Sequence, residues 1–177
     1  MVRQMKKNFF IIIFLFVSFL VGCELNNTPT SKVEEQLSKY QMLDKSITIS
    51  YTDLSKETGL DNDTKKRYEN LIKKQYQNLS YEVKEETIDG EIATVKTQIE
   101  VIDYQKIIDK YDKTSYMEEE YHNQLLTSLE KATDKITYTI NFIIKKDEQG
   151  NWQIEPLTSL EKQKLLGINT QNPEAQT

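Results

Sequence analysis

The chain of 177 residues has one cysteine, one histidine, five glycines and three prolines. The single cysteine, Cys23, excludes an intramolecular disulfide, so a folded domain has to depend on its hydrophobic core. The single histidine, His122, leaves serine-type catalysis and a zinc site short of partners. The few glycines form neither a Gly-x-Gly-x-x-Gly phosphate loop nor a Gly-x-Ser-x-Gly nucleophile elbow. These absences argue against the common catalytic and cofactor-binding motifs, and no cofactor is expected.

Positive charge is also scarce. The whole chain has 23 Lys+Arg against 28 Asp+Glu, and three of the basic residues (Arg3, Lys6 and Lys7) lie before Phe9. Without residues 1–22 the balance is 20 against 28, a formal net charge of −8. Arg67 is then the only arginine, and arginine is the residue best suited to bidentate phosphate recognition. The sequence therefore disfavours nucleic acid as a partner.

The N-terminus has the pattern of an export signal. After the basic start, Phe9–Val21 is an apolar run of 13 residues, shorter than the ~20 that a membrane-spanning helix needs. It ends in Leu20-Val21-Gly22-Cys23, which resembles the bacterial lipobox. That resemblance implies cleavage between Gly22 and Cys23 and a diacylglycerol thioether on Cys23. The bilayer would then be a partner, and the protein would be held on the outer face of the cell membrane. An ordinary signal peptide with an incidental cysteine, or an uncleaved anchor, is the alternative.

Four segments are expected along the chain. Residues 1–22 are the signal peptide, and residues 23–32 carry the lipidated cysteine and a flexible tether. Residues 33–168 form a single domain, and residues 169–177 form a disordered tail. About 155 residues after the signal are enough for one domain with a real core.

Helical periodicity appears on both sides of the strand signals. Apolar residues from Val33 to Leu43 recur at i, i+4, i+7 and i+10, which predicts a helix. The same face continues to Leu54, although the alternation across residues 47–51 also fits a strand; a continued helix is favoured. A second amphipathic helix should begin at Asp61 or Asp63 as its N-cap.

The outer face of that second helix carries the dense basic cluster of the exported chain: Lys65, Lys66, Arg67, Lys73 and Lys74. A solvated helix face is favoured for it, and contact with lipid headgroups or an acidic partner is the alternative. Residues 104–133 predict two further helical pieces. Thr158 and Glu161 fit a capping box for a last helix at 160–166, which Gly167 would end.

Strand signals occur in two pairs. Asp89-Gly90 is a hairpin turn between a strand that opens at Tyr81 and a strand that alternates from Ala93 to Val101. The residues from Ile136 to Ile144 alternate most cleanly, and a polar turn leads from them to a short strand at Trp152 and Ile154. Tight turns between strands favour an α+β fold with an antiparallel sheet of about four strands, covered by the N-terminal and central helices.

The segments Gln75–Tyr81, Asp89–Val95, Ile136–Ile140 and Gly150–Thr158 carry a resemblance to uncharacterised lipoproteins of Gram-positive bacteria. In those proteins helices wrap a curved antiparallel sheet, as in the cystatin-like or nuclear-transport-factor-two-like fold. The resemblance therefore implies this fold. It implies no activity, because the matching residues are turn and core positions.

Two constellations could support chemistry. Glu118 and Glu119 lie on the helix face of His122, but too few ligands are present for zinc, and a solvated acidic turn is favoured. Asp103 beside Tyr104 could serve as an acid/base pair in a cone-shaped fold, but strand-end turn residues are favoured there. We therefore expect no enzyme, with a small enzyme using one of these groups as the weakest alternative.

Aromatic residues are the remaining candidates for a binding site. A groove between sheet and helices could be lined by aromatic side chains at core or core-edge positions: Tyr40, Tyr76, Tyr81, Tyr121, Tyr138 and Trp152. Core packing is the ordinary role of such residues. The favoured function is a non-catalytic binding or interaction module at the cell envelope, for a protein or a small molecule. An apolar-ligand-binding cone with an internal cavity is the alternative.

Overall fold

The computed structural model describes residues 27–111, 113 and 117–170. The signal sequence and Cys23 lie outside the described residues. In chain order the elements are α2 (Pro29–Gln41), α3 (Thr52–Ser55), α4 (Asn62–Gln77), β1 (Ser80–Asp89), β2 (Ile92–Ile102), α5 (Gln105–Ile108), α6 (Glu118–Glu130), β3 (Lys135–Lys146), β4 (Trp152–Ile154) and α7 (Ser159–Leu165). This is an α+β fold, as the sequence predicts.

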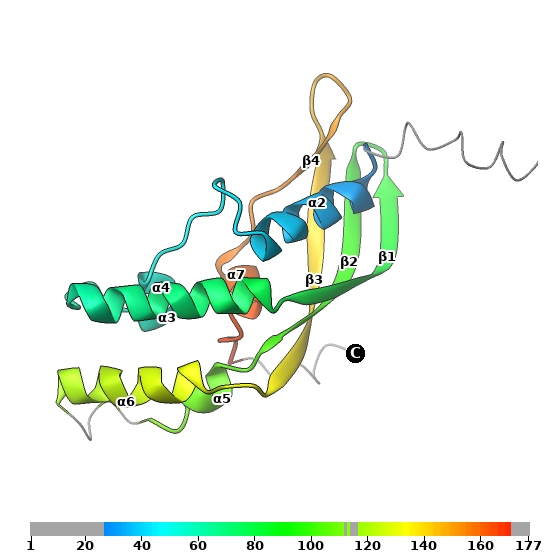
Figure 1. Cartoon of the computed structure of the whole chain (residues 1–177). Coiled ribbons are helices and arrows are strands. Elements are labelled where there is room, and N and C mark those ends of the chain that lie inside the picture. Colours follow the sequence, from blue (N-terminus) through cyan, green and yellow to red (C-terminus); the bar gives the residue numbers. More distant parts are fainter. Residues whose placement is uncertain (1–26, 112, 114–116, 171–177) are drawn as a thin grey trace, which may run out of the picture.

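The four strands form one antiparallel sheet in the order β1-β2-β3-β4. Gly90, with φ +61°, lies in the β1–β2 turn that Asp89-Gly90 predicts. Helix α2 lies across this sheet, whereas α4 and α6 lie side by side near the end where β2 finishes and β3 begins (Figure 1). None of the helices in the described ranges is both long and apolar enough to span a bilayer.

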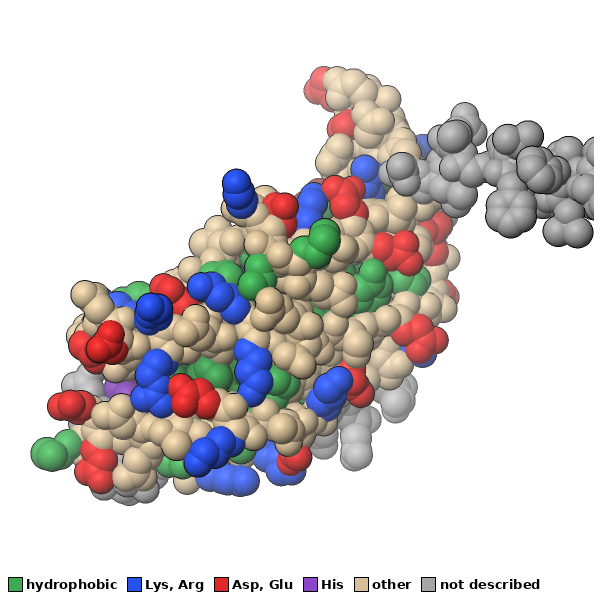
Figure 2. All heavy atoms as spheres, in the orientation of Figure 1, with side chains coloured by type: hydrophobic (Ala, Val, Ile, Leu, Met, Phe, Trp, Pro, Cys, Tyr) green, Lys and Arg blue, Asp and Glu red, His purple; other side chains and the backbone are tan. Residues whose placement is uncertain are grey.

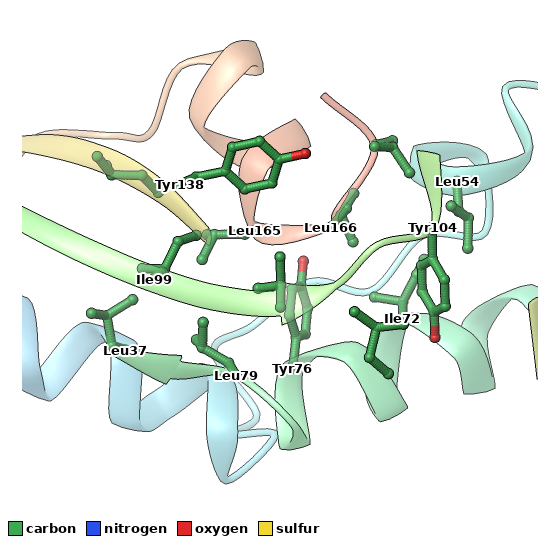
Figure 3. Packing of buried hydrophobic residues seen from close by; sticks show 14 of the residues in the cluster. Leu37, Leu54, Ile72, Tyr76, Leu79, Ile99, Tyr104, Tyr138, Leu165 and Leu166 are labelled. Atoms are coloured by element: carbon green, nitrogen blue, oxygen red, sulfur yellow. The ribbon is translucent and has the colours of Figure 1, made fainter. Parts of the chain in front are cut away.

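The inner face of the sheet is filled by side chains. The alternating residues of β2 and β3 on this face are buried: Ala93, Val95, Thr97, Ile99, Val101, Tyr138, Ile140, Phe142 and Ile144. Leu37 of α2, and Ile72 and Tyr76 of α4, pack against them, as Figure 3 shows. The alternation in the sequence exists because one face of each strand has to enter this core.

A bulge in β1 links the edge of the sheet to α2. The register between β1 and β2 shifts between Val83 and Glu85, so Glu86 lies opposite Val95 on the inner face. There one Glu86 carboxylate oxygen accepts hydrogen bonds from the backbone N–H of Thr30 (2.9 Å) and from its hydroxyl (2.7 Å). A carboxylate at this position satisfies a free N–H of the first helical turn and interacts favourably with the helix dipole.

The ordered domain begins earlier than the sequence predicts. The expected tether, residues 23–32, is helical from Pro29 onward, because Thr28 and Ser31 form a reciprocal capping box. Asn27 is also held, since its side-chain oxygen accepts a hydrogen bond from the backbone N–H of Trp152 (3.1 Å). This capping box has a serine at the third helical position, where glutamate or glutamine is usual. The sequence pattern therefore does not signal the start of the helix.

The prediction that the first helix continues to Leu54 is wrong. Helix α2 ends at Gln41, and Leu43 takes a left-handed conformation (φ 52°) that no continuing helix contains. Residues 44–51 are irregular and are followed by the single turn α3. Ile47 and Tyr51 still pack against the core, which explains why their spacing resembled a helix face.

The C-terminal segment is part of the core up to Asn169. The Thr158–Glu161 capping box is present, and Gly167 follows α7 with φ +67°. The expectation of a tail beginning at residue 169 is wrong at that residue, because Asn169 is buried and its carbonyl accepts a hydrogen bond from the Tyr138 hydroxyl (3.3 Å). Residues 171–177 lie outside the described ranges.

Three segments meet at Gly167. The Gln75 side chain of α4 is fully buried; its amide donates to the carbonyl of Ile102 (2.7 Å) and accepts from the backbone N–H of Ile102 (3.0 Å). A Cβ atom on Gly167 would lie 2.0 Å from the Ile102 carbonyl oxygen and 2.5 Å from the Gln75 amide nitrogen. Gln105 N–H also donates to the Gly167 carbonyl (2.8 Å).

Replacing Gly167 by alanine should therefore be severe. We expect Gly90→Ala, which has a positive φ but nothing within 4 Å of the new Cβ, to lower the free energy of unfolding by about 1 kcal/mol. Gly167→Ala adds the steric collision and should cost at least about 2 kcal/mol more. Urea unfolding followed by circular dichroism measures both, and equal losses in the two variants would contradict the close packing at Gly167.

Candidate functional site

A pocket of about 610 Å³ opens between α2, α3 and α7. We call it the α2–α7 pocket. Its apolar wall comes from Tyr40 near the end of α2, Ile47 in the loop that follows, Tyr76 of α4 and Leu166 just after α7. Polar side chains occupy the rest of its surface: Gln36, Ser46, Thr48, Ser50, Asp53, Lys56, Ser159, Lys162 and Gln163. Its volume is within the range of about 300–1,000 Å³ that small-ligand sites have.

The pocket exists because the chain leaves the helical path after Gln41. The left-handed conformation of Leu43 turns the backbone away from the helix axis. Asp44 N–H then donates to the carbonyl of Lys39 (2.9 Å), which gives this carbonyl of the last turn of α2 a partner. The loop then passes the end of α2, and four of its residues line the pocket: Ser46, Ile47, Thr48 and Ser50. The segment that sequence periodicity described wrongly is therefore the one that builds the pocket.

The opposite wall, α7, is fixed to the sheet. The ammonium of Lys164 is buried and donates to the carbonyl of Thr139 in β3 (2.8 Å). Burial lowers the pKa of Lys164. This contact and the close approach at Gly167 hold α7 in place, so that Lys162 and Gln163 face the pocket.

Two tyrosine rings stand at the base of the pocket. The ring centroids of Tyr40 and Tyr76 are 4.8 Å apart with an interplanar angle of 58°. Figure 3 shows Tyr76 rising from α4 toward Leu166. Burial raises the pKa of both tyrosines, and the nearby Asp53 raises the pKa of Tyr76 further, so both hydroxyls stay neutral and can donate hydrogen bonds.

The six aromatic residues predicted to line one groove are not brought together. Tyr40 and Tyr76 line the α2–α7 pocket, whereas Tyr81 lies at a separate surface hollow along β1 and β2. Tyr121 packs edge-on against His122, with ring centroids 5.2 Å apart. Burial raises the pKa of Tyr138 to about 12, and Trp152 lies under the ammonium of Lys146 at 4.8 Å. The four other residues therefore have packing roles away from this pocket.

The expectation that His122 lies in a solvated acidic turn is wrong. His122 is 2% exposed and sits between α4 and α6. Its Nδ1 is 2.8 Å from the Tyr68 hydroxyl, and its Nε2 is 3.1 Å from a carboxylate oxygen of Glu57, which also pairs with Lys113. The result is a chain of hydrogen bonds, Glu57–His122–Tyr68, that is buried at His122 and Tyr68 and ties the loop after α3 to α4 and α6.

This chain has the order carboxylate, imidazole, hydroxyl that nucleophilic catalysis uses. However, Tyr68 is fully buried, and burial raises the pKa of its hydroxyl. A hollow of about 420 Å³ lined by Gly59, Leu60, Asp61, Thr64 and Glu119 reaches His122, but both ring nitrogens already have partners. The geometry suits structural cross-linking, since the hydroxyl is not available to a substrate.

Asp103 and Tyr104 also have separate structural roles. An Asp103 carboxylate oxygen accepts a hydrogen bond from the backbone N–H of Lys106 (3.0 Å) in the first turn of α5. Tyr104 is fully buried and points toward α4, where its hydroxyl donates to the carbonyl of Leu71 (3.3 Å; Figure 3). Neither residue lines the α2–α7 pocket, so the structure does not assemble them as an acid/base pair.

Two residues of the basic cluster on α4, Arg67 and Lys74, are engaged with α6. The guanidinium of Arg67 forms two hydrogen bonds to Glu130 (2.8 and 3.1 Å), and the ammonium of Lys74 donates to the carbonyl of Glu130 (2.8 Å). Figure 2 shows basic side chains in the gap between α4 and α6, together with the single histidine. In the described part of the chain no group of three or more His, Cys, Asp or Glu side chains could hold a metal ion.

No protein-family model matches the chain, and no curated protein matches it significantly. Among solved structures, the chain is similar to the crystal structure of a "putative lipoprotein (ycdA)" from Bacillus subtilis subsp. subtilis str. 168, at 18% sequence identity and a TM-score of 0.42. The similarity covers 78% of this chain and 47% of that one, so this chain matches less than half of that protein's length. A likeness this distant carries no argument about fold or function. The conclusions on both therefore come from the residues of this chain.

Sequence reasoning missed most of the pocket. The periodicity predicts a helix across the polar residues at 46–53. It predicts Lys162 and Gln163 only as parts of a short capped helix, with Ser159 just before it. Glu57 was missed as a partner of His122 because the two are 65 positions apart in the chain. No local signal connects residues at such a separation.

The charge of Glu57 should make the stability of the domain depend on pH. Burial opposes ionisation, but hydrogen bonds from Lys113 and His122 outweigh it and lower the pKa of Glu57 below its ordinary 4.5. A lowered carboxyl pKa contributes stability above the unfolded value and loses it as the pH falls through the folded value. We expect Glu57→Gln to cost about 1 kcal/mol near pH 7 and to cost progressively less as the pH falls toward 3.

The measurement is urea unfolding of the wild type and the variant across this pH range. Glu119→Gln is the matched control, because Glu119 borders the hollow that reaches His122 but is exposed. It should change the free energy of unfolding by less than about 0.5 kcal/mol at every pH. A Glu57→Gln cost that stays constant down to pH 3 would contradict the ionised pairing.

Proposed function

We propose that this protein is a lipoprotein of the bacterial cell envelope, whose single domain binds a ligand without catalysing a reaction. The location is supported by the sequence Leu20-Val21-Gly22-Cys23 after a basic start and a short apolar run. Diacylglycerol on Cys23 would supply two acyl chains, and two such chains are needed for stable attachment to a membrane.

The observation that carries the binding role is the α2–α7 pocket. It has the size of a ligand site, it has an aromatic base, and its polar rim can orient a bound molecule. The Glu57–His122–Tyr68 chain lies elsewhere, between α4 and α6, and its hydroxyl is buried. A binding role therefore uses the accessible side chains of the domain, whereas a catalytic role would need groups that the core encloses.

The alternative of an apolar-ligand-binding cone receives less support. Such a protein would need open space beneath the sheet, where Val95, Ile140 and Phe142 are packed against the helices.

For the finer fold, we propose a relationship to the cystatin-like or nuclear-transport-factor-two-like architecture. The arrangement that supports it is an N-terminal helix, α2, laid across an antiparallel meander.

Lipid attachment has a direct test. Cys23→Ser removes the thiol that would be alkylated, so we expect complete loss of labelling by radioactive palmitate and transfer of the protein from the detergent phase to the aqueous phase. The wild type, expressed at the same level, is the positive control. Labelling that persists in Cys23→Ser would overturn the lipoprotein assignment.

Ligand binding is tested by filling the pocket. We expect Thr48→Trp, on the pocket wall, to lose small molecules that co-purify with the full-length wild type from envelope extract. Thr87→Trp, on the exposed edge strand β1, adds the same side chain far from the pocket and should retain them. Mass spectrometry of the released small molecules gives the readout, and identical sets from all three proteins would contradict binding at this pocket.

A further inference from the structure

Two opposite charges line the α2–α7 pocket, and neither pairs with a side chain in the described part of the chain. The carboxylate of Asp53 in α3 and the ammonium of Lys162 in α7 form no ion pair or side-chain hydrogen bond within the described residues. Lys56 differs from them, because its ammonium donates to the carbonyl of Asp53 (2.7 Å) and so closes the end of α3. Among the charged groups that line the pocket, Asp53 and Lys162 remain available to a ligand.

The two charges belong to opposite walls. Asp53 lies on the side of α3, close enough to Tyr76 that its charge raises the pKa of that hydroxyl. Lys162 lies on α7, whose position is fixed by the Lys164–Thr139 contact. Since the two groups are not paired with each other, a molecule between the walls could meet a negative group on one side and a positive group on the other.

The surface between these charges is aromatic and amide-rich. Tyr40 and Tyr76 offer two aromatic rings tilted against each other, with Leu166 beside them. The amides of Gln36 and Gln163 can each donate and accept hydrogen bonds, as a peptide group does. An apolar side chain and a peptide bond would therefore find matching partners in the same pocket.

We propose that the α2–α7 pocket binds a zwitterion, namely a short peptide or free amino acid with an aromatic or aliphatic side chain. This inference rests on the binding role proposed above and names its ligand class. The ligand's ammonium pairs with Asp53, its carboxylate with Lys162, and its side chain packs on Tyr40 and Tyr76. Recognition of both termini would exclude interior segments of long chains, so the pocket selects small fragments.

The test uses the dipeptide alanyl-phenylalanine as probe, with its N-acetylated and C-amidated forms, in isothermal titration calorimetry on the full-length protein in detergent. Asp53→Asn should weaken alanyl-phenylalanine about tenfold and leave the N-acetylated form unchanged, because that form has no ammonium to lose. Lys162→Gln should weaken alanyl-phenylalanine about tenfold and leave the C-amidated form unchanged.

Matched controls separate the site from general charge effects. Asp89→Asn, in the β1–β2 hairpin, and Lys66→Gln, on the exposed face of α4, make the same changes of charge away from the pocket and should leave affinity unchanged. Asp53→Glu keeps the charge and should retain more affinity than Asp53→Asn. Thermal unfolding of each variant confirms that the fold is intact.

The outcomes distinguish this inference from the broader one. Blocked and unblocked dipeptides that bind equally well would overturn zwitterion recognition while leaving the pocket as a ligand site. Failure of all three probes to bind at about 10 mM would overturn the peptide and amino-acid class. The Thr48→Trp comparison then decides independently whether the pocket binds a different kind of molecule.

Discussion

The buried amide of Gln75 is the contact on which the arrangement of this domain depends. It satisfies both backbone groups of Ile102 at the end of β2, so a side chain of α4 completes the hydrogen bonding of the sheet. A buried backbone group without a partner would cost about 1–3 kcal/mol, which makes this pairing hard to replace. Gly167 packs against the same atoms, and therefore helix, sheet and C-terminal segment share one junction. The pocket follows from it, because Tyr76 is the next residue along α4 and Leu166 directly precedes Gly167.

The parts of the fold that the sequence predicts are those decided by neighbouring residues. Alternation in β2 and β3, the Asp89-Gly90 turn, Asp61 as the N-cap of α4 and the Thr158–Glu161 box all act within a few positions. The loop after α2 could not be predicted in this way. Its apolar residues keep helical spacing because Ile47 and Tyr51 reach the core, yet Leu43 adopts a left-handed conformation that only the tertiary contacts at the end of α2 justify.

The candidate site was less predictable for the same reason. Tyr40 and Tyr76 are aromatic candidates from the sequence and do lie together. Residue type and spacing alone do not separate them from Tyr121 or Tyr138, which pack elsewhere. The role of a charged residue depends on which groups lie opposite it in the folded protein. Arg67 is held by Glu130 across the gap between α4 and α6, whereas the ammonium of Lys162 forms no ion pair within the described residues. Such distinctions require the three-dimensional arrangement of residues far apart in sequence.

The hydrogen bond between Asn27 and Trp152 has a consequence for how the domain would sit above a membrane. Four peptide units separate Cys23 from Asn27, and fully extended they span only about 14 Å. A lipid on Cys23 would thus hold the domain close to the membrane at the end where Asn27 contacts β4. Helix α2 then leads away from that mooring for 13 residues, about 20 Å, to the mouth of the pocket beside Tyr40. With the domain attached in this way, the α2–α7 pocket would lie at the end away from the bilayer and open toward the surrounding medium.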